Sequence, residues 1–267
     1  MGVPLPALSK PNAGCLSLRN LPPFSPVAAK LMALLRQENI SFRDAADLLK
    51  SDAAMTAEVL RLANSPTAGL RFPTTSLLQA LSVLGVNRIA SLTTTLCVGR
   101  LLKPLAKLPL MRRCWRHNLA TALIASQWSA EYNVDSEKAY TFGLLAGLGR
   151  LALLVSDPQV YSQLAERAQI ERIPLEILEN RFYGFDHRDA GRWLITEWKL
   201  PTELNDVLAG SPIDGPNATL ALLIRAATTE AIRFGFGILD SQPVDAPDAS
   251  SFEIAERVNQ IEQELGI

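Results

Sequence analysis

An apolar stretch at residues 139–153, AYTFGLLAGLGRLAL, constrains the fold more than any other part of the sequence. It carries one charge, at Arg150, and three glycines, Gly143, Gly147 and Gly149. A helix that is apolar on every side belongs in the middle of a helical core, and this stretch is shorter than the roughly 20 residues of a bilayer span. Each glycine costs a helix about 0.8–1 kcal/mol relative to alanine. We therefore expect a neighbouring helix or a ligand to approach this backbone closely.

Helix start and stop signals recur along the rest of the chain. Pro26 follows a capping Ser25, Gly85 is placed to end a helix, and Asp186 is placed to cap another. We expect one helix over residues 136–155, and no segment of four or more residues has the period-two alternation of a strand. The sequence therefore predicts an all-α fold. A compact multi-helix domain with a sizeable core fits a chain of 267 residues of which 48% are hydrophobic.

The two ends of the chain differ from its middle in composition. Residues 1–19 are rich in Pro, Gly, Ser and Asn and predict a flexible N-terminal arm. Residues 214–267 are interpreted as a C-terminal helical extension, in which residues 241–250, SQPVDAPDAS, form a linker. The tail helix after this linker places four apolar residues on one face: Ile254, Val258, Ile261 and Leu265. That face can dock on its own domain, or it can contact a partner or a second copy of the chain in a homodimer.

Three observations concern the compartment. No window of 18 apolar residues exists, so we expect no membrane span and no membrane partner. The N-terminus lacks the basic region and apolar run of a secretory signal. Cys15, Cys97 and Cys114 are scattered without the spacing of a metal site, which favours reduced thiols. The sequence therefore predicts a cytoplasmic protein.

Charge is unevenly distributed, although the whole chain has a net charge of −1. No acidic residue lies between residues 59 and 130, a span whose basic-face candidates are Arg100, Lys103, Lys107, Arg112, Arg113 and Arg116. Residues 237–267 are strongly acidic. Either the acidic tail lies near the basic face or both are simply solvated, or the basic face binds a nucleotide, a nucleic acid or an acidic partner. Aromatic residues are not interleaved with the basic ones, which weakens the case for nucleic acid.

Several motifs occur in order between residues 20 and 212. They are LPPFSPVA at 21–28, LRLANS at 60–65, TSLLQAL at 75–81, WRHN at 115–118, GLL at 143–145 and GFDH at 184–187, followed by Trp198 and Pro201. Together they resemble the HDOD family, the HD-related output domains of bacterial signalling proteins. The resemblance implies an HDOD-like domain over residues 20–213, with an N-terminal helical lobe at about 20–105 and an HD-like lobe at about 106–213. It also implies a regulatory role rather than an enzymatic one.

The same resemblance bears on metal binding. Enzymes of the HD superfamily hold a hydrolytic metal with an early His, a His-Asp pair and a later Asp, a ligand set that suits a divalent ion activating water. His117 matches the early His, but the pair falls on Ala146 and Gly147, and the later Asp falls near Ala227. A His-His pair common in HDOD chains is replaced by GSP at 210–212. The resemblance therefore implies no metal, no cofactor and no catalytic residue.

What remains of the metal site is a set of candidates for a relic pocket, which are His117, Ala146, Gly147, Arg150 and His187. We expect that apolar packing has closed this former site. Two alternatives stay open: a small anionic ligand in a remaining pocket, and a metal held by the two histidines with Asp186 or Asp189.

The resulting functional prediction is a non-catalytic signal-transduction protein that acts by binding regulatory protein partners. One alternative is a residual metal-dependent phosphohydrolase or nucleotide-binding regulator. Another is a nucleic-acid-binding regulator that uses the basic face at residues 61–116.

Overall fold

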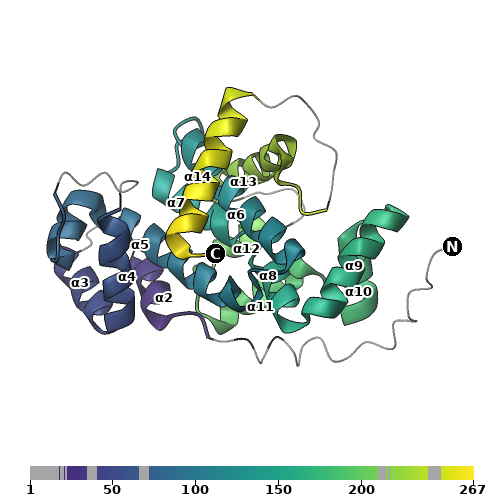
Figure 1. Ribbon diagram of the computed structural model, residues 1–267, viewed down its shortest axis with the longest axis horizontal. Helices are drawn as coiled ribbons and strands as arrows, with labels where there is room; N and C mark the ends of the chain where they lie inside the picture. Colours follow the sequence, from purple (N-terminus) through teal and green to yellow (C-terminus); the bar gives the residue numbers. More distant parts are fainter. Residues whose placement is uncertain are drawn as a thin grey trace.

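The computed structural model describes Leu18, Leu21 and residues 23–34, 41–65, 72–209, 215, 217–239 and 248–267. All regular secondary structure in these ranges is helical, which confirms the predicted all-α class (Figure 1). Apart from Leu18, the predicted N-terminal arm lies outside the described residues, as does most of the predicted linker.

The N-terminal lobe is a set of helices packed on one long helix. Its elements are α2 (Pro26–Leu34), α3 (Phe42–Lys50), α4 (Ala53–Ala63), α5 (Leu77–Leu102) and the short 3-10 turn η2 (Lys103–Leu105). Local sequence sets the starts of α3 and α5, because the side chains of Ser41 and Ser76 accept hydrogen bonds from backbone N–H groups three residues later. Gly85, predicted to end a helix, has a φ of 80° and bends α5.

The second lobe surrounds α6. Its elements are α6 (Pro109–Trp128), α7 (Ser136–Leu145), α8 (Leu148–Ser156), α9 (Pro158–Glu171), α10 (Leu175–Tyr183), α11 (His187–Glu197) and α12 (Leu204–Leu208). The C-terminal extension adds α13 (Ala218–Ala231), the π-helical turn η3 (Ile232–Phe236) and α14 (Ala249–Leu265). Helix α6 packs against α7, α8, α13 and α14. In Figure 1, α2–α5 lie at one end of the molecule, α9 and α10 at the other, and α14 crosses the middle.

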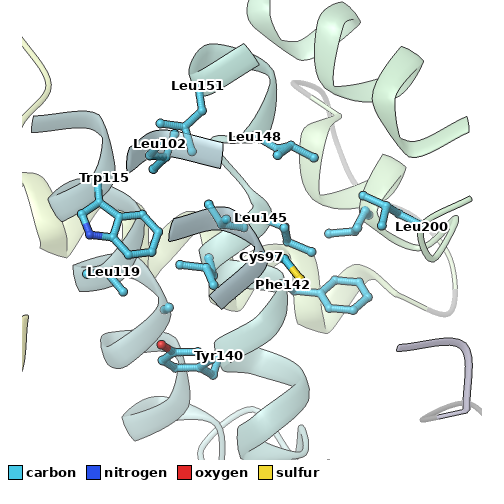
Figure 2. Close-up of a cluster of buried hydrophobic side chains, with 14 of the residues drawn as sticks. Cys97, Leu102, Trp115, Leu119, Tyr140, Phe142, Leu145, Leu148, Leu151 and Leu200 are labelled. Carbon is cyan, nitrogen blue, oxygen red and sulfur yellow. The ribbon is translucent and has the colours of Figure 1, made fainter. Parts of the chain in front are cut away.

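The apolar stretch at residues 139–153 forms two helices, so the prediction of one helix over 136–155 is wrong. Helix α7 ends at Leu145 and α8 begins at Leu148. Side chains on both sides of the break are buried in the core beside Trp115 and Leu119 of α6 (Figure 2). The stretch is therefore the centre of the second lobe, as its composition predicts.

Neighbouring helices explain two of the three glycines in this stretch. A Cβ at Gly143 would lie 2.8 Å from the Cα of Ala122, so α6 and α7 pack backbone to backbone. A Cβ at Gly149 would overlap the backbone oxygen of His187 and lie 2.5 Å from the nitrogen of Gly191, so α8 and α11 do the same. These glycines permit close helix packing rather than ligand access.

Two segments, Leu77–Leu105 and Ser136–Ser156, are long and apolar enough to cross a membrane by length and composition. The sequence analysis expected none. Most of each segment is buried inside the fold, and the second is broken at Gly147. Both are core helices of the kind found in soluble proteins.

Candidate functional site

A cavity of about 730 Å³ lies where α6, α7, α8, α11 and α13 come together. Its lining includes all five relic-pocket residues, which are His117, Ala146, Gly147, Arg150 and His187. The expectation that apolar packing has closed this place is therefore wrong. Ala146 carries too little side chain to fill the space at the junction of α7 and α8, whereas the space beside Gly147 is occupied by the side chain of Asn118.

The end of α11 at the cavity is fixed by local sequence. The Asp186 side chain accepts hydrogen bonds from the N–H groups of Arg188 and Asp189, and Asp189 bonds back to the N–H of Asp186. This capping box starts α11 at His187. The His187 ring therefore lies in the first turn of α11, beside Arg150 of α8.

A chain of polar contacts runs behind the cavity wall. His187 Nδ1 lies 2.6 Å from Glu179 Oε2, and His187 Nε2 lies 3.0 Å from Arg150 Nη2. The Glu179 carboxylate is fully buried and also accepts hydrogen bonds from the His187 N–H and the Tyr161 hydroxyl. Since the carboxylate can only accept and the guanidinium can only donate, His187 is the neutral tautomer with its proton on Nδ1.

The charges in this chain of contacts follow from burial and neighbours. Burial lowers the pKa of His187, and the positive charge of Arg150 lowers it further. Burial alone would raise the pKa of Glu179, but the hydrogen bond from His187, the positive charge of Arg150 and the hydrogen bond from Tyr161 outweigh it and lower that pKa. The buried charges are thus one carboxylate, Glu179, and one guanidinium, Arg150, joined by a neutral imidazole.

His117 is held by the C-terminal extension. Its Nδ1 lies 2.9 Å from the backbone oxygen of Phe236 in η3, so Nδ1 carries the proton and donates it. Burial, with a further contribution from Arg150, lowers the pKa of His117 to about 4. The imidazole is therefore neutral at physiological pH, with Nε2 as an acceptor.

This pKa predicts how stability depends on pH. The unfolded chain protonates His117 near pH 6.5 and the folded chain near pH 4, so the unfolded state binds more protons between these values. The contribution of His117 to the free energy of unfolding is therefore fully present above about pH 6.5. It is lost as the pH falls through about 4, and the loss is about 3 kcal/mol. Urea unfolding of wild type and His117→Gln across this range checks it. On acidification the variant should lose less unfolding free energy than wild type, because of the two histidines only His187 still contributes to the loss. Equal losses in both proteins contradict the buried neutral His117.

The residues present do not fit a hydrolytic metal of the HD type. Ala146, Gly147 and Ala227 have no ligating atoms, and Ala227 is fully buried. Both ring nitrogens of His187 are engaged, one of them by the Arg150 guanidinium, whose charge repels a cation. Among the described residues, no group of three or more His, Cys, Asp or Glu is arranged to hold a metal.

The alternative of two histidines and a carboxylate also lacks its third ligand. The carboxylate of Asp186 caps α11, and that of Asp189 lies 2.7 Å from Arg192 Nη1. These side chains act in helix capping and a surface ion pair. They are not among the residues that line the cavity.

The tail helix α14 is placed on its own domain (Figure 1). Ile254 and Val258 are fully buried, and Ile261 and Leu265 pack half-buried against the core. Of the alternatives for this apolar face, the structure therefore has the intramolecular one.

Charge pairs join α14 to the predicted basic face. Glu262, which is almost fully buried, lies 2.6 Å from Arg116 Nη1 and 3.4 Å from Arg112 Nη2. Arg100 lies 3.5 Å from a backbone oxygen of α4. Lys103 and Lys107 are exposed, and Arg113 is partly buried. Part of the basic face is thus covered by the acidic tail.

Several residues that line or support the site are not among the site residues predicted from the sequence. Glu179, Asn118, Thr121 and Arg225 are the main ones. Glu179 lies four residues after Leu175 and four before Tyr183, both buried, so a carboxylate at a core position of α10 was a usable signal. Asn118 and Thr121 lie on the buried face of α6, where the same argument applies.

Comparison with solved structures shows the same fold in other proteins. An HDOD domain protein of unknown function from Geobacter sulfurreducens is 22% identical, with a TM-score of 0.73 over 95% of this chain and 94% of its own. A proposed signal transduction protein from Marinobacter aquaeolei VT8 is 21% identical, with a TM-score of 0.67 over 93% of this chain and 60% of its own. A proposed phosphohydrolase from Shewanella amazonensis SB2B is 20% identical, with a TM-score of 0.64 over 95% of each chain.

Sequence comparison gives a curated relative and a family. An uncharacterized protein of Treponema pallidum (strain Nichols) is 22% identical over 175 residues, which are 64% of this chain. The match spans only 34% of that protein's length. The family model of the HDOD domain matches residues 21–211, the region in which the motifs from LPPFSPVA to Pro201 occur. Since this match includes well over half of the chain, the protein belongs to the HDOD domain family.

Proposed function

We propose that this protein is a non-catalytic, cytoplasmic regulator of bacterial signal transduction that acts by binding a partner protein. The observation that carries the proposal is the place of Arg150 and Ala146–Gly147 in the cavity. At the position where HD enzymes bind a metal, this chain has a methyl group, a hydrogen and a guanidinium. Of the HD ligand set, only His117 remains to hold a cation and the water it would activate.

The surroundings of Gly147 support the loss of metal chemistry. A Cβ at residue 147 would overlap the Oδ1 of Asn118, which packs against this backbone. An aspartate at 147 therefore requires Asn118 to move. Because Ala146 and Ala227 also lack ligating atoms, one substitution at residue 147 does not restore the ligand set.

The comparisons supply context for this proposal. The motifs of the chain resemble output domains of signalling proteins, and the Marinobacter structure is described as a signal transduction protein. The Shewanella structure is described as a phosphohydrolase, which favours the enzymatic alternative for that protein. The residues that replace the HD ligands in this chain, Ala146, Gly147 and Ala227, support the regulatory alternative.

Metal content and hydrolysis test the proposal directly. The protein is purified from medium supplemented with iron, manganese and zinc, and bound metal per chain is measured together with hydrolysis of bis(p-nitrophenyl) phosphate. We expect far less than one metal per chain and hydrolysis equal to a buffer blank, in wild type and in His117→Ala alike. Stoichiometric metal, or turnover, that disappears in His117→Ala would falsify the proposal.

The nucleic-acid alternative is disfavoured by the contacts of Glu262. Arg112 and Arg116 already pair with this carboxylate, so a nucleic acid using them has to displace α14. Affinity for DNA or RNA that falls steeply with salt and is lost in Arg112→Glu with Arg113→Glu is the result that would favour this alternative.

A further inference from the structure

We propose that the cavity around Arg150 binds a small organic anion, a molecule with one carboxylate or phosphate group and an apolar body. Nothing in this proposal depends on the partner protein, because it concerns the lining of the cavity alone. It goes beyond the proposed function by giving the regulator a ligand.

The first argument is a pair of buried polar groups without a partner, on two residues that line the cavity. Asn118 and Thr121 line it and are only 2% and 1% exposed. Within the part of the chain that the structure describes, Asn118 Nδ2 and Thr121 Oγ1 have no hydrogen-bond partner. The two residues lie one turn apart on α6, so both can reach a single ligand group. Buried donors without partners are rare in folded proteins, and a bound acceptor satisfies both.

The second argument is the sign of the charge. Three guanidinium groups line the cavity, those of Arg150, Arg188 and Arg225, against one carboxylate, that of Glu176. Glu179 balances Arg150, and Arg188 lies 3.8 Å from Asp186. Arg225, which is exposed, donates to the neutral backbone oxygen of Ala209 at 3.3 Å. Arg225 and Glu176 are the two charges that this balance leaves in the lining, and no ion pair joins them in the part of the chain that the structure describes. The Arg225 guanidinium is therefore the group that can bind the carboxylate or phosphate oxygens of a ligand.

The third argument is size and apolar surface. Most of the rest of the lining is apolar and includes Leu175, Val207, Leu208, Ile224 and Ile238. A volume of about 730 Å³ lies within the range of about 300–1,000 Å³ for sites that take organic ligands. An inorganic ion would leave this apolar surface unused. An apolar group attached to the anion occupies it.

The test uses two probe anions, phenyl phosphate and phenylacetate, on the full chain. Binding is measured by titration calorimetry and by the shift in thermal midpoint. We expect saturable binding of at least one probe, with inorganic phosphate and phenol each at least tenfold weaker. No binding of either probe overturns the proposal. If inorganic phosphate binds as tightly as phenyl phosphate, the claim that the site recognises an apolar body is overturned and the cavity is a site for free phosphate.

Two variants locate the binding. Thr121→Val removes the unpartnered hydroxyl at almost constant volume, and Arg225→Gln removes an exposed charge, so both should fold. Each substitution should lower the affinity for the probe at least tenfold. Arg43→Gln, an exposed arginine of α3 away from the cavity, is the matched control and should leave affinity unchanged. Unchanged affinity in both cavity variants contradicts the assignment.

Discussion

Replacing Gly149 with alanine should destabilise the protein by about 3 kcal/mol, the upper part of the range for overpacking a close contact. The new Cβ would overlap the backbone oxygen of His187 and crowd the nitrogen of Gly191. Both neighbours are backbone atoms, which cannot rotate away as a side chain does, so α8 and α11 must separate. The gain in helix propensity, about 1 kcal/mol for glycine to alanine, is too small to offset this.

Gly99→Ala provides the matched control for this prediction. Gly99 also lies within a helix, and a Cβ there would meet only the side-chain ends of Leu265 and Ile267, each at 3.2 Å. These are the ends of flexible side chains, which can shift by a few tenths of an ångström. Urea unfolding followed by circular dichroism should show Gly99→Ala near wild type and Gly149→Ala far below it. Equal stability of the two variants contradicts the close packing of α8 on α11.

Features set by nearby sequence could be predicted. The predicted N-caps at Ser25 and Asp186 act on residues at most three positions away, so their signals are complete in a short window. The break between α7 and α8 could not be predicted in this way. It depends on Asn118 packing against Gly147 and on α11 packing against Gly149, which are contacts between distant parts of the chain.

Only some of the residues that line the cavity could be predicted from the sequence. The metal-binding motif of the HD superfamily predicted His117 and Ala146–Gly147, because the position of a ligand in the motif can be recognised even where the ligating residue has been replaced. No motif contains Thr121, and in the sequence it resembles any other core position of the helix. Only the structure shows that its hydroxyl has no hydrogen-bond partner among the described residues.

The tail helix shows a different limit. Its apolar spacing is equally suited to its own domain and to a partner, since periodicity gives a face but not its neighbour. The pair of Glu262 and Arg116 decides the question, and these residues are 146 positions apart. The uneven distribution of charge suggested that the acidic tail pairs with the basic face. It could not distinguish this arrangement from one in which both segments are solvated.

Replacing Glu179 with alanine should cost about 3–5 kcal/mol of stability, because it removes a buried charged acceptor of three hydrogen bonds and leaves their donors without a partner. The carboxylate is fully buried and accepts hydrogen bonds from Tyr161 and from the ring and backbone of His187. Its loss leaves Arg150 as an uncompensated buried charge. The lowered pKa of Glu179 means that its contribution is present at neutral pH and is lost as the pH falls below about 4.5. The difference between wild type and variant should therefore shrink in acid.

Glu171→Ala is the surface control, because Glu171 pairs with Arg167 at 2.7 Å in a largely exposed position, where a pair contributes about 0–1 kcal/mol. A second comparison separates charge from packing. In Glu179→Leu with Arg150→Met both charges are gone, so no buried charge is left unpaired, and this double variant should be more stable than Glu179→Ala. Denaturant unfolding of the four proteins gives the order. If the double variant is instead the least stable, the hydrogen bonds to Tyr161 and His187, and not the charge of Arg150, are what Glu179 contributes.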